Sequence, residues 1–201
     1  DRYLDPPLLE NFTNKATAGG SNVRVDRDFT DNDRMSFYIR SNEARFLVPN
    51  DLTQQMAGQR QDRFSGETAA QVHYYRVFNP RTLGSFRFMY RDLSARLWSN
   101  RESTPVRVEQ DRGLKEGVLV GDLTLEGEYH TFKLGGDLRI NKIREEFRFG
   151  ETDEFPAFAV DFRDAQQSNE VSLFAQDHIR WGNFAANLGL RYDHYEFLIN
   201  A

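Results

Sequence analysis

The four histidines are the residues of this chain best suited to hold a transition metal. His73, His130, His178 and His194 are far apart, no His-x-x-x-His pair occurs, and the chain has no cysteine. Zinc sites draw on histidine and cysteine at short spacings. Glycine-rich phosphate loops and the Gly-x-Ser-x-Gly elbow are also missing from the sequence. We therefore predict neither an enzyme nor a metal or cofactor site.

A group of carboxylates is the second candidate for chemistry, and we expect it in a long polar loop over about 148–167. Its members are Glu145, Glu146, Glu151, Asp153, Glu154, Asp161 and Asp164. Such a group could attract a cation or a cationic solute, but it lacks the regular oxygen-ligand spacing of a calcium loop. A solvated, charged loop is the interpretation that we prefer.

Three arginines, Arg101, Arg107 and Arg112, fall in a second polar stretch, over about 98–112. A guanidinium group binds carboxylate or phosphate through paired hydrogen bonds, so these residues are candidate contacts for an anionic ligand. Loop arginines are also ordinary soluble surface. Residue type alone therefore identifies no ligand here.

Elsewhere, charged and uncharged residues alternate along the chain, which is typical of β-strands with one dry and one wet face. We expect the uncharged face to contact lipid through Phe86, Phe88, Leu119, Leu123, Leu125, Phe132, Leu134, Leu138, Leu188 and Leu190. We expect the opposite face to line a polar lumen through Arg87, Arg91, Glu116, Asp122, Lys133, Asp137, Arg139, Arg191 and Asp193. A ladder of cross-strand ion pairs on any wet sheet face is the plainer alternative.

The alternation predicts an all-β fold, an antiparallel up-and-down meander of about eight long strands that is a section of a larger transmembrane β-barrel. The expected strands are 20–29, 34–46, 65–78, 83–97, 114–126, 130–147, 168–180 and 184–199. Very short turns alternate with long polar loops over about 47–64, 98–112 and 148–167, a rhythm typical of outer-membrane barrels. We divide the chain into a loop segment, 1–19, and a partial barrel domain without a plug, 20–201.

Aromatic residues gather near the strand ends, as in the interface girdles of membrane barrels. The predicted girdles are Phe29, Phe78, Trp181 and Phe184 by the short turns, and Phe46, Trp98, Phe147, Tyr195 and Phe197 toward the long loops. Arg27 and Arg76 fall on the apolar phase close to a short turn, where a long side chain can reach lipid head groups. Asp177 is also out of phase, which predicts a bulge or an early strand end.

The C-terminal hairpin resembles TonB-dependent receptors of the Oar-like type. The matching strands read Ser-Leu-Phe-Ala-Gln-Asp-His at 172–178 and Asn-Leu-Gly-Leu-Arg-Tyr-Asp at 187–193. Residues 4–6 (Leu-Asp-Pro), 10–12 (Glu-Asn-Phe) and 46–50 (Phe-Leu-Val-Pro-Asn) are similar to loops of the same group. The resemblance covers most of the chain, and the hairpin is its specific part.

The resemblance implies a receptor in the Gram-negative outer membrane that takes up a scarce solute actively. Its partners would be outer-membrane lipid, a plug domain, the remaining strands of a barrel of about 22 strands, and TonB through a segment not in this chain. We expect this chain to be an internal section of such a receptor. The net charge of −5 argues against a nucleic-acid partner.

Two other functions stay open from the sequence. A small complete barrel acting as an adhesin or passive pore would show the same alternation, as would a soluble secreted β-sandwich that binds carbohydrate. The uncharged face is rich in Gly, Leu and Phe and poor in the β-branched residues that soluble sheets favour, which favours the membrane barrel.

Overall fold

Eight long β-strands make up nearly all of the computed structural model, which describes residues 13, 15–103, 107–150 and 160–199. The strands are 15 to 22 residues long, well above the 5–6 residues usual in soluble proteins. Their bounds are β1 (Ala16–Thr30), β2 (Asp33–Leu47), β3 (Gln61–Asn79), β4 (Thr82–Ser99), β5 (Arg107–Glu126), β6 (His130–Gly150), β7 (Val160–Trp181) and β8 (Phe184–Ile199).

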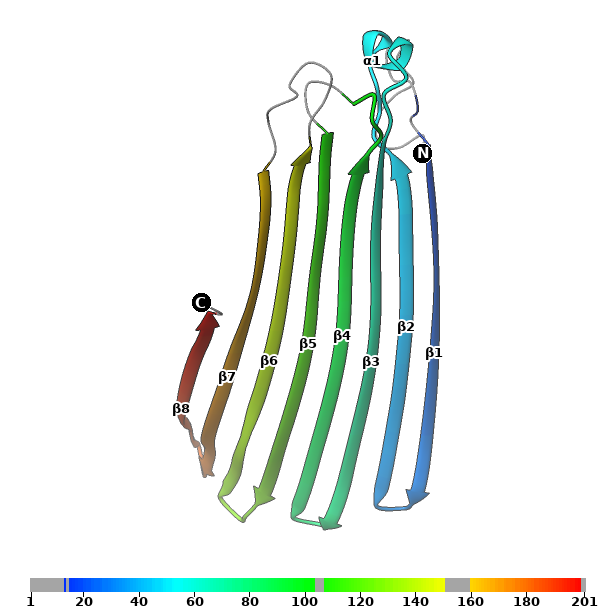
Figure 1. Cartoon of the computed structure of the whole chain (residues 1–201). Coiled ribbons are helices and arrows are strands. Elements are labelled where there is room, and N and C mark those ends of the chain that lie inside the picture. Colours follow the sequence, from blue (N-terminus) through cyan, green and yellow to red (C-terminus); the bar gives the residue numbers. More distant parts are fainter. Residues whose placement is uncertain (1–12, 14, 104–106, 151–159, 200–201) are drawn as a thin grey trace.

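The strands form one sheet in the order β1 to β8, and each pairs antiparallel with the next along the chain (Figure 1). This confirms the predicted all-β, up-and-down meander. Within the described residues β1 and β8 are the edges of an open sheet, consistent with a section of a barrel. A β-sandwich needs a second sheet, and the described part of the chain forms only this one.

Tight turns and long connections lie at opposite ends of the sheet, as predicted (Figure 1). The β7–β8 turn consists of Gly182 and Asn183, and Gly182 has a φ of 58°. Glycine adopts this left-handed conformation without the steric penalty that a Cβ atom brings. The conformation of the β7–β8 turn therefore follows from its local sequence.

The strands extend further toward the long connections than the sequence predicted. β5 begins at Arg107 rather than 114, and β7 begins at Val160 rather than 168. β1 begins at Ala16, so residues 16–19 are strand rather than loop. Charged residues occupy both faces of the added segments of β5 and β7, so the sequence loses its period of two there while the backbone ladder continues.

A short helix, α1 (Leu52–Met56), lies in the connection between β2 and β3, where the sequence indicated only a loop. Asp51 caps it by accepting a hydrogen bond from the Gln54 amide, and the Gln54 side chain accepts one from the Asp51 amide. This reciprocal pair is a capping box. Across the described residues, no helix has both the length and the apolar character needed to span a membrane.

Candidate lumen wall and lipid-facing surface

The structure places all nine predicted lumen residues on one face of the sheet, which we call the ionic face. Cross-strand register shows this directly, since Arg91 is paired with Glu116 and Asp137 with Ser172, which is in turn paired with Asp193. Arg87 lies on the same face, opposite Val120. Strand alternation alone was sufficient to group these side chains.

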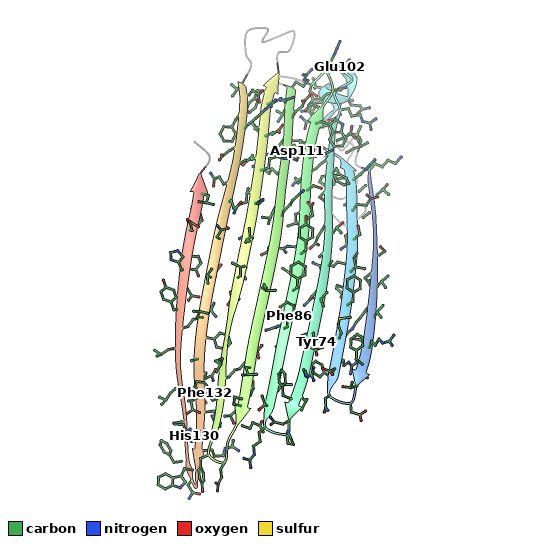
Figure 2. The ribbon with its side chains drawn as sticks, turned by 60° about the horizontal axis from the view of Figure 1, so that its bottom comes forward. Tyr74, Phe86, Glu102, Asp111, His130 and Phe132 are labelled. Carbon is green, nitrogen blue, oxygen red and sulfur yellow. The ribbon has the colours of Figure 1, made fainter. Side chains whose placement is uncertain are left out.

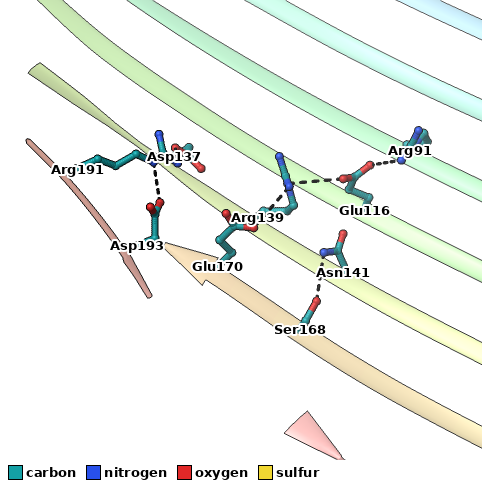
Figure 3. A network of polar contacts seen from close by, with 9 residues as sticks. All are labelled: Arg91, Glu116, Asp137, Arg139, Asn141, Ser168, Glu170, Arg191 and Asp193. Atoms are coloured by element: carbon teal, nitrogen blue, oxygen red, sulfur yellow. Dashed lines mark hydrogen bonds and ion pairs between the residues drawn. The ribbon is translucent and has the colours of Figure 1, made fainter. Parts of the chain in front are cut away.

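Four of these strands are joined by a chain of ion pairs at mid-height (Figure 3). Glu116 of β5 lies 2.7 Å from Arg91 of β4 and 3.7 Å from Arg139 of β6. Arg139 continues to Glu170 of β7 at 3.5 Å. Glu116 is only 9% exposed, so the charge balance around it affects stability more than a surface pair would.

Two further clusters extend the ionic face toward the short turns. Arg191 of β8 lies 2.8 Å from Asp193 and 3.4 Å from Asp137 of β6 (Figure 3). Lys133 lies 3.2 Å from Asp122, which also accepts a hydrogen bond from Ser85 at 2.5 Å. Both signs of charge are therefore paired across strands, which is the cross-strand ladder that the sequence left as an alternative.

The opposite, apolar face carries all ten predicted lipid contacts, since each has the same strand phase as Leu119. Leu119 is 38% exposed, Leu134 37% and Leu188 62%. A second protein layer would bury such side chains, and the described residues provide none. Figure 2 shows Phe86 and Phe132 on the half of the sheet nearer the short turns.

The apolar surface is a band that covers only this half of the strands. On β5 it runs over nine residues, 117–125, close to the 9–11 that a tilted strand needs to cross a bilayer. Beyond the row of Tyr90, Gly117 and Ile140, the next row on this face begins with Asp92 and Lys115. We call the residues of this face that lie between the short turns and the row of Tyr90 the apolar band.

The aromatic residues predicted to ring the long-loop side do not border this band. Trp98 lies on the same face but beyond Asp92 and Arg96, because the strands continue past the band. Phe46, Phe147, Tyr195 and Phe197 are on the ionic face, as their register partners show. By the short turns the prediction agrees with the structure, and the residues concerned, all exposed, are Phe29, Phe78, Trp181 and Phe184.

The three residues that broke the alternation have partners on the apolar face. The Arg27 guanidinium lies 5.5 Å from the centre of the Phe29 ring, and Arg76 lies 5.5 Å from that of Phe78. Asp177 pairs with Phe132 in unbroken register, so the predicted bulge or early strand end is wrong. Its carboxylate lies 2.7 Å from the His130 ring near the short turn, where a polar pair is tolerated.

The predicted group of loop arginines is not a single site. Arg101 lies in the β4–β5 connection, but Arg107 and Arg112 are part of β5 and point to opposite faces. Arg112 is on the ionic face, 2.6 Å from Glu145, whereas Arg107 lies 3.6 Å from Glu109. Because β5 begins earlier than the sequence suggested, the prediction that these two arginines are in a loop is wrong.

The acidic group is also divided. Glu145 and Glu146 are in β6, and Asp161 and Asp164 are in β7. On each strand one of the two carboxylates is on the ionic face and the other on the apolar face. Residues 151, 153 and 154 lie outside the described residues. Among the described side chains, no three metal-binding groups come together.

An open hollow of about 940 Å³ lies on the ionic face, between the ion-pair chain and the long connections. Its floor is apolar, with Leu93, Leu114 and Ile143 side by side across β4 to β6, and Arg112 with Glu145 on its loop side. The sequence did not predict this hollow. The sequence does contain a sign of it, since these three apolar residues occupy strand positions that alternate in step with the charged residues of the ionic face.

Polar side chains join the first two long connections. Asn100 donates a hydrogen bond to the Gly58 carbonyl at 2.8 Å and accepts one from the Arg60 amide at 2.9 Å. Asn50 donates to the Gln59 carbonyl, and Ser103 is fully buried beside Asn100. Asp62 accepts hydrogen bonds from Arg60 and so raises the pKa of that guanidinium above its ordinary value.

Comparison with family models agrees with a barrel strand arrangement that has one charged and one apolar face. The model for the β-barrel of TonB-dependent receptor-like proteins matches residues 3–200. The chain belongs to this family. No curated protein is similar enough to the chain to count as a match.

Membership of the TonB-dependent receptor-like family implies a receptor or transporter of the outer membrane. Receptors of this family work with a plug domain and with TonB. The family is not an enzyme class. The two faces described above belong to an open sheet that is consistent with a section of a barrel wall.

Proposed function

We propose that this chain forms part of the wall of a receptor for active solute uptake across the outer membrane. In this proposal the apolar band contacts lipid, and the ionic face lines the interior. Solute is captured on the long-connection side, where Arg101 and the ionic-face hollow lie. It then passes along the charged wall when a plug moves.

The observation that carries the proposal is the contrast between the two faces of the same strands. On β5, Glu116 and Asp122 are ion-paired on one face while Leu119 and Leu123 have no covering layer in the described structure on the other. A wall between lipid and water requires this contrast. The paired charges also hold neighbouring strands in register while presenting polar groups to a solute or plug.

The test compares the medium consumed by cells that carry the gene for this protein with that consumed by cells lacking it. Untargeted mass spectrometry should find a solute whose depletion requires both the gene and TonB, as cells that lack TonB but keep an energised inner membrane can show. A passive pore, the second candidate, would deplete the solute equally in cells with and without TonB. Gene-dependent depletion that is unchanged by the loss of TonB would contradict active uptake.

A further inference from the structure

A row of charges follows immediately where the apolar band ends. On this face Tyr90, Gly117 and Ile140 are succeeded by Asp92, Lys115 and Lys142, two residues further along β4, β5 and β6. A side chain at this level lies at the depth of lipid head groups if the band fills the hydrocarbon region. The head groups concerned belong to the leaflet on the long-connection side.

Lys115 and Lys142 are directly opposite each other in the β5–β6 register. Like charges in this arrangement repel and destabilise a sheet. Asp92 lies 3.8 Å from Lys115, but no described acidic side chain lies within ion-pair distance of Lys142. The pair therefore has excess positive charge that an added anion would neutralise.

The next row on the same face leaves space beside the lysines. Ser94, Gly113 and Ala165 have small or no side chains, and Arg144 lies among them. Together the two rows enclose a hollow of about 570 Å³, which we call the basic hollow. Its charged lining is Asp92, Arg96, Lys115, Lys142 and Arg144.

Asp111 reduces the positive charge at the far side of the basic hollow. Its carboxylate lies 3.0 Å from Arg144 and 3.1 Å from Arg96. Those two arginines share the carboxylate of Asp111, whereas of the two lysines nearest the apolar band only Lys115 has a carboxylate within ion-pair distance. Among the basic residues that line the basic hollow, the one without a described carboxylate within ion-pair distance is Lys142, which lies in the row next to the apolar band.

We propose that the basic hollow binds a phosphate group of an anionic lipid in the leaflet on the long-connection side. Lys115 and Lys142 contact the phosphate from two strands, with Arg144 behind them, and the acyl chains lie against the apolar band below. Charge-assisted contacts of ammonium and guanidinium groups with phosphate are strong, especially at a partly dry interface. The proposal rests on the apolar band facing lipid, as in the proposed function, and is independent of solute uptake.

The test measures binding of bisphosphorylated lipid A to the detergent-solubilised protein by native mass spectrometry. Replacing both lysines (Lys115→Gln with Lys142→Gln) should weaken binding roughly fivefold for each lysine. The charge-retaining pair Lys115→Arg with Lys142→Arg should bind as the parent does. Arg163→Gln, which removes a charge from the same face outside the basic hollow, is the matched control and should also bind normally.

Two further arms identify the ligand and verify folding. Dephosphorylated lipid A should bind as weakly as the double glutamine variant, and inorganic phosphate should not displace the bound lipid. Without lipid the glutamine variant should unfold at the same or a higher temperature than the parent, because repulsion between the lysines is gone. Equal binding of phosphorylated lipid by parent and glutamine variant, or equal binding of the two lipids by the parent, would overturn the proposal; solute uptake by the cells would be untouched by that result.

Discussion

At the scale of single residues, the ionic face shows how one carboxylate can link several strands. Glu116 is nearly buried and lies between Arg91 and Arg139, so its charge offsets two guanidinium groups. Breaking a buried pair costs more than the pair contributes, because the remaining charge is left without its partner. The stabilising role of this residue therefore depends on its neighbours as much as on itself.

We predict that Glu116→Gln lowers the free energy of unfolding by about 1–3 kcal/mol, since it leaves Arg91 without a carboxylate and Arg139 with Glu170 alone. Thermal or urea unfolding of the protein in detergent micelles measures this. Glu128→Gln, in the exposed β5–β6 turn, removes the same charge and should change stability by less than about 0.5 kcal/mol. Equal effects of the two substitutions would show that the ion-pair chain contributes nothing specific.

At the scale of elements, the first two long connections are held to each other as well as to their own strands. Asn100 in the β4–β5 connection hydrogen-bonds to Gly58 and Arg60 in the β2–β3 connection, about forty residues earlier. The buried Ser103 and Asn50 extend this junction. These two connections, on the proposed solute-capture side, are therefore held in a fixed arrangement relative to each other.

Asn100→Ala should open this junction by removing two hydrogen bonds, worth about 1–3 kcal/mol together. Amide exchange at Arg60 should then become roughly ten to a hundred times faster, as hydrogen–deuterium exchange can measure. The exposed neighbour Arg101 provides the control, since Arg101→Ala should leave exchange at Arg60 unchanged. An unaltered rate in the Asn100 variant would mean that the backbone alone holds the connections together.

The sequence could predict the apolar band but not the full strands, and the reason is physical. From Leu119 to Leu125 a lipid-facing residue alternates with one on the wet face, so the period of two is visible. From Arg107 to Lys115 charged residues occur on both faces, so residue type no longer reports orientation while backbone hydrogen bonds continue. Arg107 and Arg112 were assigned to a loop for this reason.

The loop junction and the two hollows were beyond prediction for a different reason. Asn50, Asn100 and Ser103 are ordinary loop residues, and only their meeting across the sheet gives them a structural role. The opposed lysines of the basic hollow are 27 residues apart, and their pairing depends on the β5–β6 register. Contacts of this kind follow from register and connection geometry, which local patterns do not specify.

At the scale of the whole molecule, the open sheet has an apolar band on one face and ion pairs on the other, and the two extend over different lengths of the strands. The apolar band covers only the half nearer the short turns, while ion pairs follow the other face to the long connections. Among residues of the apolar face, Figure 2 labels Phe132 toward the short turns and Asp111 beyond the apolar band toward the long connections. We infer that the strands project beyond the membrane on the long-connection side, where the basic hollow and the loop junction lie.

The central claim is that the apolar face contacts lipid while the ionic face contacts water, and alternate residues of β5 test it most directly. The chain has no cysteine, so single cysteines at Leu119, Val120, Leu123 and Thr124 can each carry a fluorescent label in the protein reconstituted into bilayers. Lipid-attached quenchers should quench labels at Leu119 and Leu123, and a water-soluble quencher should quench those at Val120 and Thr124. Equal quenching at all four positions, or the reverse pattern, would contradict the account.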